Sequence, residues 1–175
     1  MICGFKQKFS DGTPTYFREK ILASARKVSA LDIVSAHASG QCQYSEKGVP
    51  IGFAPKLHTL RIGNRWGAGM SIQMAYGVRT KNYEQFNKGI TELEIVKSVQ
   101  TIKIEGRPKI WQGESYVQRI WIDGKSLCLT HSQIVTLAIN DGFVDGGYGE
   151  AAIRFFNWFS KDFEGQIIHW TDLRY

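Results

Sequence analysis

The alternation of apolar and polar residues predicts several short β-strands along this chain. A strand with one buried face shows such alternation, because successive side chains point to opposite sides. The strands predicted in this way are residues 1–9, 56–62, 71–78, 96–105 and 166–170. Within residues 116–127, Asp123-Gly124 lies between two apolar runs and predicts a hairpin turn. Most of these strands follow one another directly, which favours antiparallel pairing.

Apolar residues at helical spacing predict three helices. The first follows the turn chemistry of residues 10–15, and Thr15 is placed to cap it. The second covers residues 132–139 and ends at Asp141-Gly142, and the third covers residues 150–159. On the third helix, the residues expected to face inward are Ile153, Phe156 and either Trp158 or Phe159.

The organisation of the chain predicts a single α+β domain over residues 1–175. Residues 26–55 are small and polar, with several glycines, and are interpreted as a loop or insertion. The expected architecture is a mixed, mostly antiparallel sheet flanked by helices. The terminal strand follows the last helix and could pair with the first strand, which would close a small barrel.

The composition is that of an ordinary globular protein, with 43% hydrophobic and 22% charged residues. No stretch reaches the ~20 apolar residues that span a bilayer, and residues 1–12 lack the apolar core of a signal peptide. Export and membrane insertion are therefore not expected. The three cysteines, Cys3, Cys42 and Cys128, form no paired motif and fit a reducing cytoplasm. The four histidines are scattered, so neither a metal site nor a cofactor is expected.

The positive charge is concentrated in one segment. The chain has 22 Lys and Arg against 16 Asp and Glu, for a net charge of +6. Between Lys47 and Tyr83 there is no acidic residue. The cations in that window are Lys47, Lys56, Arg61, Arg65, Arg79 and Lys81. Such a field attracts phosphates of a polynucleotide or of a small nucleotide, although a solvated basic surface would look the same.

The strand at residues 56–62 carries the most plausible chemistry. Common phosphate-loop, nucleophile-elbow and metalloprotease motifs do not occur. A lysine beside arginines, such as Lys56, has a lowered pKa and can serve as a base. The hydroxyl of Thr59 would then be a nucleophile, with a carboxylate supplied from elsewhere. A phosphate-binding strand or a simple packing strand remains the alternative.

The residues Lys56-x-x-Thr59-x-Arg61, followed by Trp66-x-x-Gly69 and Gly77-x-Arg79, resemble the ASCH domain of the PUA-like superfamily. The opening GFKQKF and the terminal QIIHWTDLRY are similar to ASCH-type proteins of phages and prophages. The family signature GxKxxExR is matched at its lysine and arginine, whereas Ala54 and Thr59 occupy the glycine and glutamate positions. The resemblance implies a β-barrel with a cleft that binds RNA or modified nucleobases, in the host cytoplasm if the protein is phage-encoded.

Short ASCH amidohydrolases that act on acetylated cytidine also carry threonine in place of that glutamate. Their catalytic set of lysine, threonine and a later glutamate carries over to Lys56, Thr59 and, most plausibly, Asp141. Aspartate is one methylene shorter than glutamate at the third position. The chain is also longer than those enzymes, mainly through residues 26–55 and a hairpin at 107–128.

The resemblance also places the basic segment around the cleft. The residues expected to bind a ligand are Arg61, Arg65, Trp66, Arg79, Lys81 and Tyr83. Aromatic rings among these cations, including Tyr76, could stack on a base, an interaction worth roughly 1–3 kcal/mol per base. A tryptophan in such a turn is also commonly a core anchor. His58 is expected to be a hydrogen-bonded partner, and His169 and Trp170 are expected to pack.

Three functions follow from these observations. The first is a binding module that recognises RNA or a nucleotide through the basic cleft. The second is an amidohydrolase that removes an acyl group from N4-acetylcytidine-like nucleosides. The third, which depends on the phage-like resemblance alone, is a counter-defence protein that sequesters a nucleotide signal.

Overall fold

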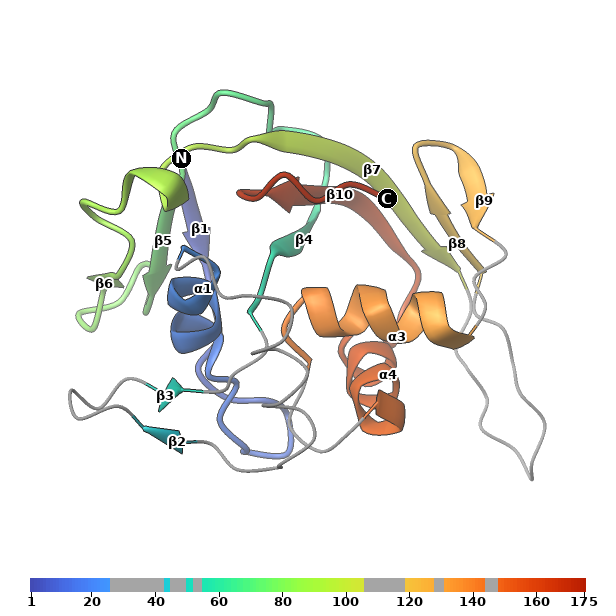
Figure 1. The fold of residues 1–175 in the computed structure, drawn as a ribbon, viewed down its shortest axis with the longest axis horizontal. Helices are drawn as coiled ribbons and strands as arrows, with labels where there is room; N and C mark the ends of the chain where they lie inside the picture. The colour runs from blue at the N-terminus through green and yellow to red at the C-terminus, as the bar shows by residue number, and fades with distance from the viewer. Residues whose placement is uncertain (26–42, 45–49, 52–54, 106–118, 128–130, 144–147) are drawn as a thin grey trace.

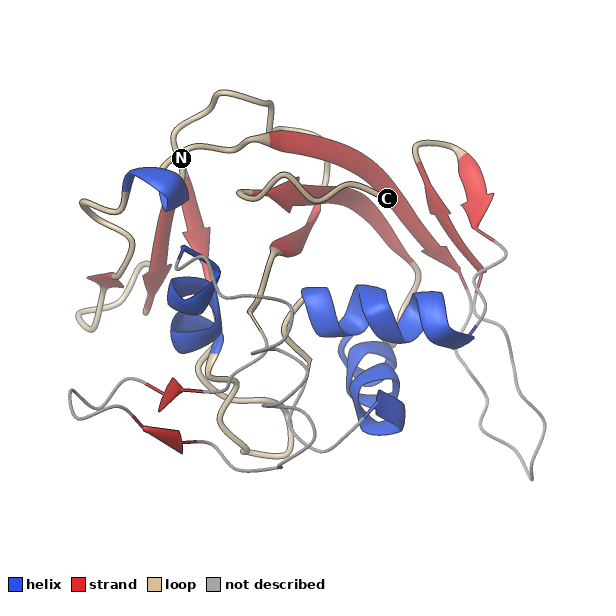
Figure 2. Ribbon diagram, viewed as in Figure 1, coloured by secondary structure: helices blue, strands red, loops and turns tan. Residues whose placement is uncertain are grey.

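The computed structural model describes residues 1–25, 43–44, 50–51, 55–105, 119–127, 131–143 and 148–175. Most of the predicted insertion at 26–55 lies outside these residues, as do Lys47, Ala54, Cys42 and Cys128. The described chain combines helices with mostly antiparallel strands, so the predicted α+β class is confirmed (Figure 2). Among the described residues, no helix is long and apolar enough to cross a bilayer.

The larger sheet has five strands in the order β4-β10-β7-β8-β9, and every neighbouring pair is antiparallel. Its strands are β4 (His58–Ile62), β7 (Ser98–Glu105), β8 (Arg119–Ile122), β9 (Lys125–Leu127) and β10 (Phe163–His169). The predicted hairpin at Asp123-Gly124 joins β8 to β9. Both turn residues have positive φ, as a two-residue hairpin of type I′ requires.

A smaller sheet contains β1 (Ile2–Gly4), β5 (Gln73–Tyr76) and β6 (Glu84–Gln85). In this sheet β1 is parallel to β5, and β5 is antiparallel to β6. A further two-stranded ribbon pairs β2 (Gln43–Tyr44) with β3 (Pro50–Ile51), and the short 3₁₀ helix η1 (Thr91–Leu93) precedes β7.

The predicted pairing of the first and last strands is wrong. Strand β10 bonds to β4 along one edge and to β7 along the other, so neither edge is available to β1. Strand β1 instead pairs with β5. The described strands therefore form separate open sheets rather than a closed barrel.

Three helices complete the fold: α1 (Phe17–Ala25), α3 (His131–Asn140) and α4 (Tyr148–Trp158). Helix α3 lies under the concave side of the five-stranded sheet and packs against α4, whereas α1 lies beside β1 and β5 (Figure 1). All three helices were predicted from apolar spacing. In the last one, Phe159 is buried and Phe156 packs against the core as expected, whereas the inward position expected for Ile153 is wrong, because it is 45% exposed. The inward residues of α4 and the turn after it are Ala151, Ala152, Phe155 and Phe159.

An aromatic cluster joins the N-terminal segment to the helices. The ring of Phe143, directly after α3, has its centroid within 6.3 Å of those of five other rings. Those rings belong to Phe9, Phe17, Phe155, Trp158 and Phe159. Edge-to-face contacts of this kind add to the stabilisation that burial provides. The cluster thereby holds residues 5–17 against α3 and α4.

Replacing Gly165 by alanine should separate β10 from β4. A Cβ at this position would collide with the backbone oxygen of Arg61 on β4, and backbone atoms cannot move aside cheaply. We expect Gly165→Ala to lower the free energy of unfolding by about 1–3 kcal/mol, measured by urea denaturation. Gly67→Ala is the matched control, because its Cβ would meet only the side chain of Met70, at 3.7 Å. Equal losses in the two variants would contradict this explanation.

Candidate functional site

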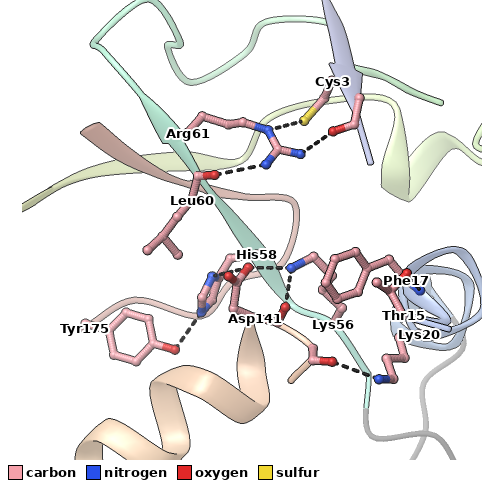
Figure 3. A network of polar contacts seen from close by, with 12 residues as sticks. Cys3, Thr15, Phe17, Lys20, Lys56, His58, Leu60, Arg61, Asp141 and Tyr175 are labelled. Carbon is pink, nitrogen blue, oxygen red and sulfur yellow. Dashed lines mark hydrogen bonds and ion pairs between the residues drawn. The ribbon is translucent and has the colours of Figure 1, made fainter. Parts of the chain in front are cut away.

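The ammonium group of Lys56 is buried at the C-terminal end of α3. Its Nζ donates hydrogen bonds to the backbone oxygen and to Oδ1 of Asp141, the first residue after the helix (Figure 3). The two residues are only 1% and 3% exposed. The neighbouring backbone N–H of Leu57 donates to the oxygen of Asn140 at 2.8 Å. Because the carbonyls at a helix C-terminus carry partial negative charge, this end of α3 favours a cation.

A second buried lysine reaches the same turn. Lys20 of α1 donates from Nζ to the backbone oxygen of Gly142 at 2.8 Å, and its own carbonyl accepts the N–H of Lys56 at 3.0 Å. Gly142 has φ +89°, and a Cβ there would lie 3.1 Å from Cδ of Lys56. Glycine is therefore needed both for the backbone conformation and for the close passage of the Lys56 side chain.

Burial is the largest influence on the pKa values of both Lys56 and Asp141. It lowers the pKa of Lys56 to about 8, although the Asp141 carboxylate opposes this change. The same burial raises the pKa of Asp141, against the effect of the Lys56 ammonium. Removing a charge from water disfavours the charged form of both groups. Lys56 can therefore lose or gain a proton near neutral pH, as a general base must.

A cavity of about 380 Å³ opens beside this pair, between β4, the N-terminal segment and the end of α4. Its described lining includes four cationic side chains and one carboxylate. The polar residues that line it are Lys6, Lys8, Ser10, Lys56, Thr59, Arg61, Asp141 and Asn157. Much of the remaining wall consists of aromatic rings, among them Phe5, Phe9 and Trp158. The cavity thus combines an excess of positive charge with apolar, aromatic surface.

The three residues predicted as catalytic all line this cavity. Lys56 and Asp141 are directly bonded, and Thr59 lies on β4 with 2% of its surface exposed. They come from the approach to β4, from β4 itself and from the turn after α3, more than 80 residues further along the chain. That all three line one cavity is a fact of the fold, and their catalytic roles remain a prediction.

Arg61 lines the cavity and also ties the two sheets together. Its Nε donates to Sγ of Cys3 at 3.2 Å, and its Nη2 donates to the oxygen of Gly4 at 2.6 Å. A third bond runs from Nη1 to the oxygen of Leu60, and the guanidinium lies 4.9 Å from the ring centroid of Phe5. Arginine has five N–H donors, so two are left for an anion after these three bonds.

The other predicted ligand-binding residues do not line this cavity in the described part of the chain. Arg65 is exposed on the turn after β4. Arg79, Lys81 and Tyr83 are exposed on the turn between β5 and β6, where Arg79 has φ +66°. Because β5 pairs with β1 and β6 rather than with β4, this turn belongs to the smaller sheet. Of the cations predicted to surround one cleft, only Lys56 and Arg61 line this cavity in the described part of the chain.

Two of the three aromatic residues expected to stack on a base, Trp66 and Tyr76, are buried, whereas Tyr83 is exposed but does not line this cavity. Trp66 is 5% exposed, and its backbone N–H and oxygen are both held by the side-chain amide of Gln166, at 2.9 and 3.1 Å. It is a core anchor, so the stacking role predicted for it is wrong. Tyr76 is also buried, and its hydroxyl accepts the N–H of Arg18 at 2.9 Å. Burial raises the pKa of Tyr76 to about 12.

Sequence reasoning missed three lysines of this region. Lys6 and Lys8 line the cavity. Their position between Phe5 and Phe9 could have predicted a cationic face beside buried rings. Lys20 carried no such signal, because a lysine in an amphipathic helix usually lies in solvent.

Two buried histidines lie behind the Lys56–Asp141 pair. His58 shares a hydrogen bond of 2.8 Å between Nε2 and the hydroxyl of Tyr175, so its predicted role as a hydrogen-bonded partner is confirmed. His169 packs against it with 5.3 Å between ring centroids. Burial lowers the pKa of His169 to about 4 and that of His58 well below its usual value. Both rings are therefore neutral at pH 7.

Comparison of the chain with models of protein families, with curated proteins and with solved structures finds no match. Among the described residues, no group of three or more His, Cys, Asp or Glu is placed to hold a metal ion.

The buried histidines should make the protein sensitive to acid. The unfolded chain protonates His169 near pH 6.5, whereas the folded chain does so near 4, so stability falls as the pH drops between these values. The difference corresponds to about 3 kcal/mol. Thermal unfolding from pH 7 to pH 4 measures this slope, and His169→Phe should make it shallower. An unchanged slope in His169→Phe would show that His169 is not the group involved.

Proposed function

We propose that this chain binds a small anionic nucleotide or modified nucleoside in the cavity beside Lys56. The observation that carries the proposal is the charge of the lining, in which four cations face a single carboxylate that is already paired with one of them. Lys6, Lys8 and Arg61 are left to attract an anion.

The size and the walls of the cavity support a single small ligand. Ligand pockets commonly measure about 300–1,000 Å³, and this one, at about 380 Å³, lies near the lower limit. The aromatic walls add apolar surface, and the half-buried ring of Trp158 already has the Lys6 ammonium 5.0 Å from its centroid. A length of RNA would need a more extended basic groove than these residues provide.

The ASCH resemblance supports the same ligand class. The matching residues Lys56 and Arg61, and the threonine at position 59, all belong to the cavity lining. In the PUA-like interpretation, the two open sheets would be the parts of such a barrel, and the cavity would be its cleft.

Neutralising Lys8 should weaken binding of a nucleotide, whereas neutralising Lys81 should not. Lys8 lines the cavity, and Lys81 is equally cationic but lies on the turn between β5 and β6. We expect Lys8→Gln to weaken binding of cytidine monophosphate roughly threefold to tenfold, because one charge contact to the anion is lost. Titration calorimetry measures the affinity.

Cytidine, inorganic phosphate and a short single-stranded RNA serve as further ligands in the same titration. Tighter binding of the RNA, with equal losses in Lys8→Gln and Lys81→Gln, would favour the extended basic surface that the sequence predicted. No detectable binding of any nucleotide or nucleoside would overturn the proposal.

A second candidate function is removal of an acyl group from N4-acetylcytidine or a similar nucleoside. It is favoured by a specific observation: a buried lysine with a pKa of about 8 shares the cavity with a buried threonine and a carboxylate. At pH 7 about one tenth of such a lysine is neutral. Neutral Lys56 would accept the proton of the Thr59 hydroxyl as its oxygen attacks the acyl carbon.

The proposed reaction needs only the side chains of the cavity and water. The acyl C–N bond breaks as the Thr59 ester forms, and the proton held by Lys56 passes to the departing cytosine amine. Water then hydrolyses the ester to release the carboxylic acid and restore the Thr59 hydroxyl. Asp141 would orient the Lys56 amine throughout.

Thr59→Val should abolish any deacylation while leaving the fold intact, since valine matches threonine in shape but lacks the hydroxyl. We expect cytidine and acetate to appear from N4-acetylcytidine with the native chain, at a rate that rises with pH up to about 8 as Lys56 loses its proton. Chromatography of the nucleosides measures the reaction. Thr101→Val, on the exposed face of β7, is the matched control. Full activity in Thr59→Val, or none in the native chain, would remove this candidate.

A further inference from the structure

A chain of hydrogen-bonded polar groups, buried at His58 and half-buried at Asn140 and Tyr175, reaches the Lys56–Asp141 pair without lining the cavity. Asn140 donates from Nδ2 to the hydroxyl oxygen of Tyr175 at 2.9 Å. That hydroxyl lies 2.8 Å from Nε2 of His58. The other ring nitrogen of His58, Nδ1, faces Oδ1 of Asp141 at 3.7 Å (Figure 3).

The bond from Asn140 favours one position for the proton of His58, because it uses the Tyr175 oxygen as an acceptor. An amide nitrogen only donates, so the Tyr175 oxygen accepts from Asn140 and directs its own proton to an acceptor. Among the described residues, the acceptor within reach of this hydroxyl is Nε2 of His58. A neutral imidazole that accepts at Nε2 carries its proton on Nδ1. Asn140 and Tyr175 therefore direct the N–H of His58 at Asp141.

This N–H has no hydrogen-bond partner within the described part of the protein, although His58 is completely buried. The separation of 3.7 Å from Oδ1 of Asp141 is too long for a hydrogen bond. The same carboxylate oxygen is bound by Lys56. His58 is thus a donor held beside an acceptor that another group already occupies.

We propose that His58 is a positioning residue whose Nδ1–H takes over Oδ1 of Asp141 when Lys56 turns toward a ligand in the cavity. This inference rests on the proposed ligand site and adds a residue to it. A buried carboxylate left without a partner is strongly disfavoured, so Lys56 could not otherwise leave Asp141 easily. His58 stays neutral throughout and transfers no proton.

The charged and titratable groups around His58 act consistently with this role. Its ring faces Lys56, Asp141, His169 and Tyr175. Burial, and then the positive charges of Lys56 and of a protonated His169, lower its pKa. Burial also raises the pKa of Tyr175, so the phenol keeps the proton that it directs to His58.

The first test is the ¹⁵N spectrum of His58 in the full chain at pH 7, without ligand. We expect the shifts of a neutral ring protonated on Nδ1. A ring protonated on Nε2 would overturn the proposal, because no N–H would then face Asp141.

The second test compares two amide replacements. His58→Asn places its side-chain N–H near the position of Nδ1, whereas His58→Gln places it near that of Nε2. An NMR titration of Lys56 should give a pKa near 8 in His58→Asn and a value higher by about one in His58→Gln, where the deprotonated state lacks the replacement donor. Equal values in the two variants would overturn the proposal.

Tyr175→Phe provides an independent variant if either replacement fails to fold. It keeps the ring of Tyr175 but removes the hydroxyl, so His58 should lose its preference for Nδ1–H and the pKa of Lys56 should rise. A retained preference for Nδ1–H would count against the inference. None of these measurements uses a ligand. Absence of nucleotide binding would therefore remove the proposed function without deciding the role of His58. Unchanged Lys56 titrations would overturn the role of His58 even where binding is found.

Discussion

The structure depends on a lysine ammonium held in the interior at the end of a helix. A buried charge is strongly disfavoured unless an opposite charge and hydrogen bonds surround it. Lys56 obtains both from one residue, since the backbone oxygen and the carboxylate of Asp141 accept its Nζ donors. Lys20 binds the next carbonyl of the same turn, at Gly142. These hydrogen bonds therefore join three segments, namely the approach to β4, the end of α3 and helix α1, within the hydrophobic core.

Because of the same arrangement, the charged residues of the cavity have different partners. Asp141 is committed to Lys56, so the carboxylate does not cancel the field of the remaining cations. Arg61 uses two of its donors to join β4 to β1 and contributes positive charge to the cavity wall as well. In the proposed functions, chemistry and recognition fall to different groups: proton exchange to Lys56, and attraction of an anion to the surrounding cations. A site of this kind suits both proposed functions, which differ only in whether Thr59 reacts.

The position of the smaller sheet explains why part of the basic segment lies elsewhere. Strand β5 pairs with β1, so the turn that carries Arg79 and Lys81 extends from that sheet rather than toward the end of α3. The cations that replace them at the cavity, Lys6 and Lys8, come from the segment that follows β1. Charge density along the sequence led to the proposal of an anionic ligand, whereas strand pairing determined which cations lie at the cavity.

The sequence by itself determined the elements whose signals are local. Alternation predicted β7, helical spacing predicted the three helices, and Asp123-Gly124 predicted the β8–β9 hairpin, because each pattern reflects contacts within a few residues. The resemblance in Lys56-x-x-Thr59-x-Arg61 and the suggestion of Asp141 identified residues that do share a cavity. Tertiary structure alone decided that β10 pairs with β4 and β7, that Trp66 is enclosed and that Lys20 is buried. Those outcomes depend on which strand edges are occupied and on contacts between segments far apart in the chain, and a local pattern carries no information about either.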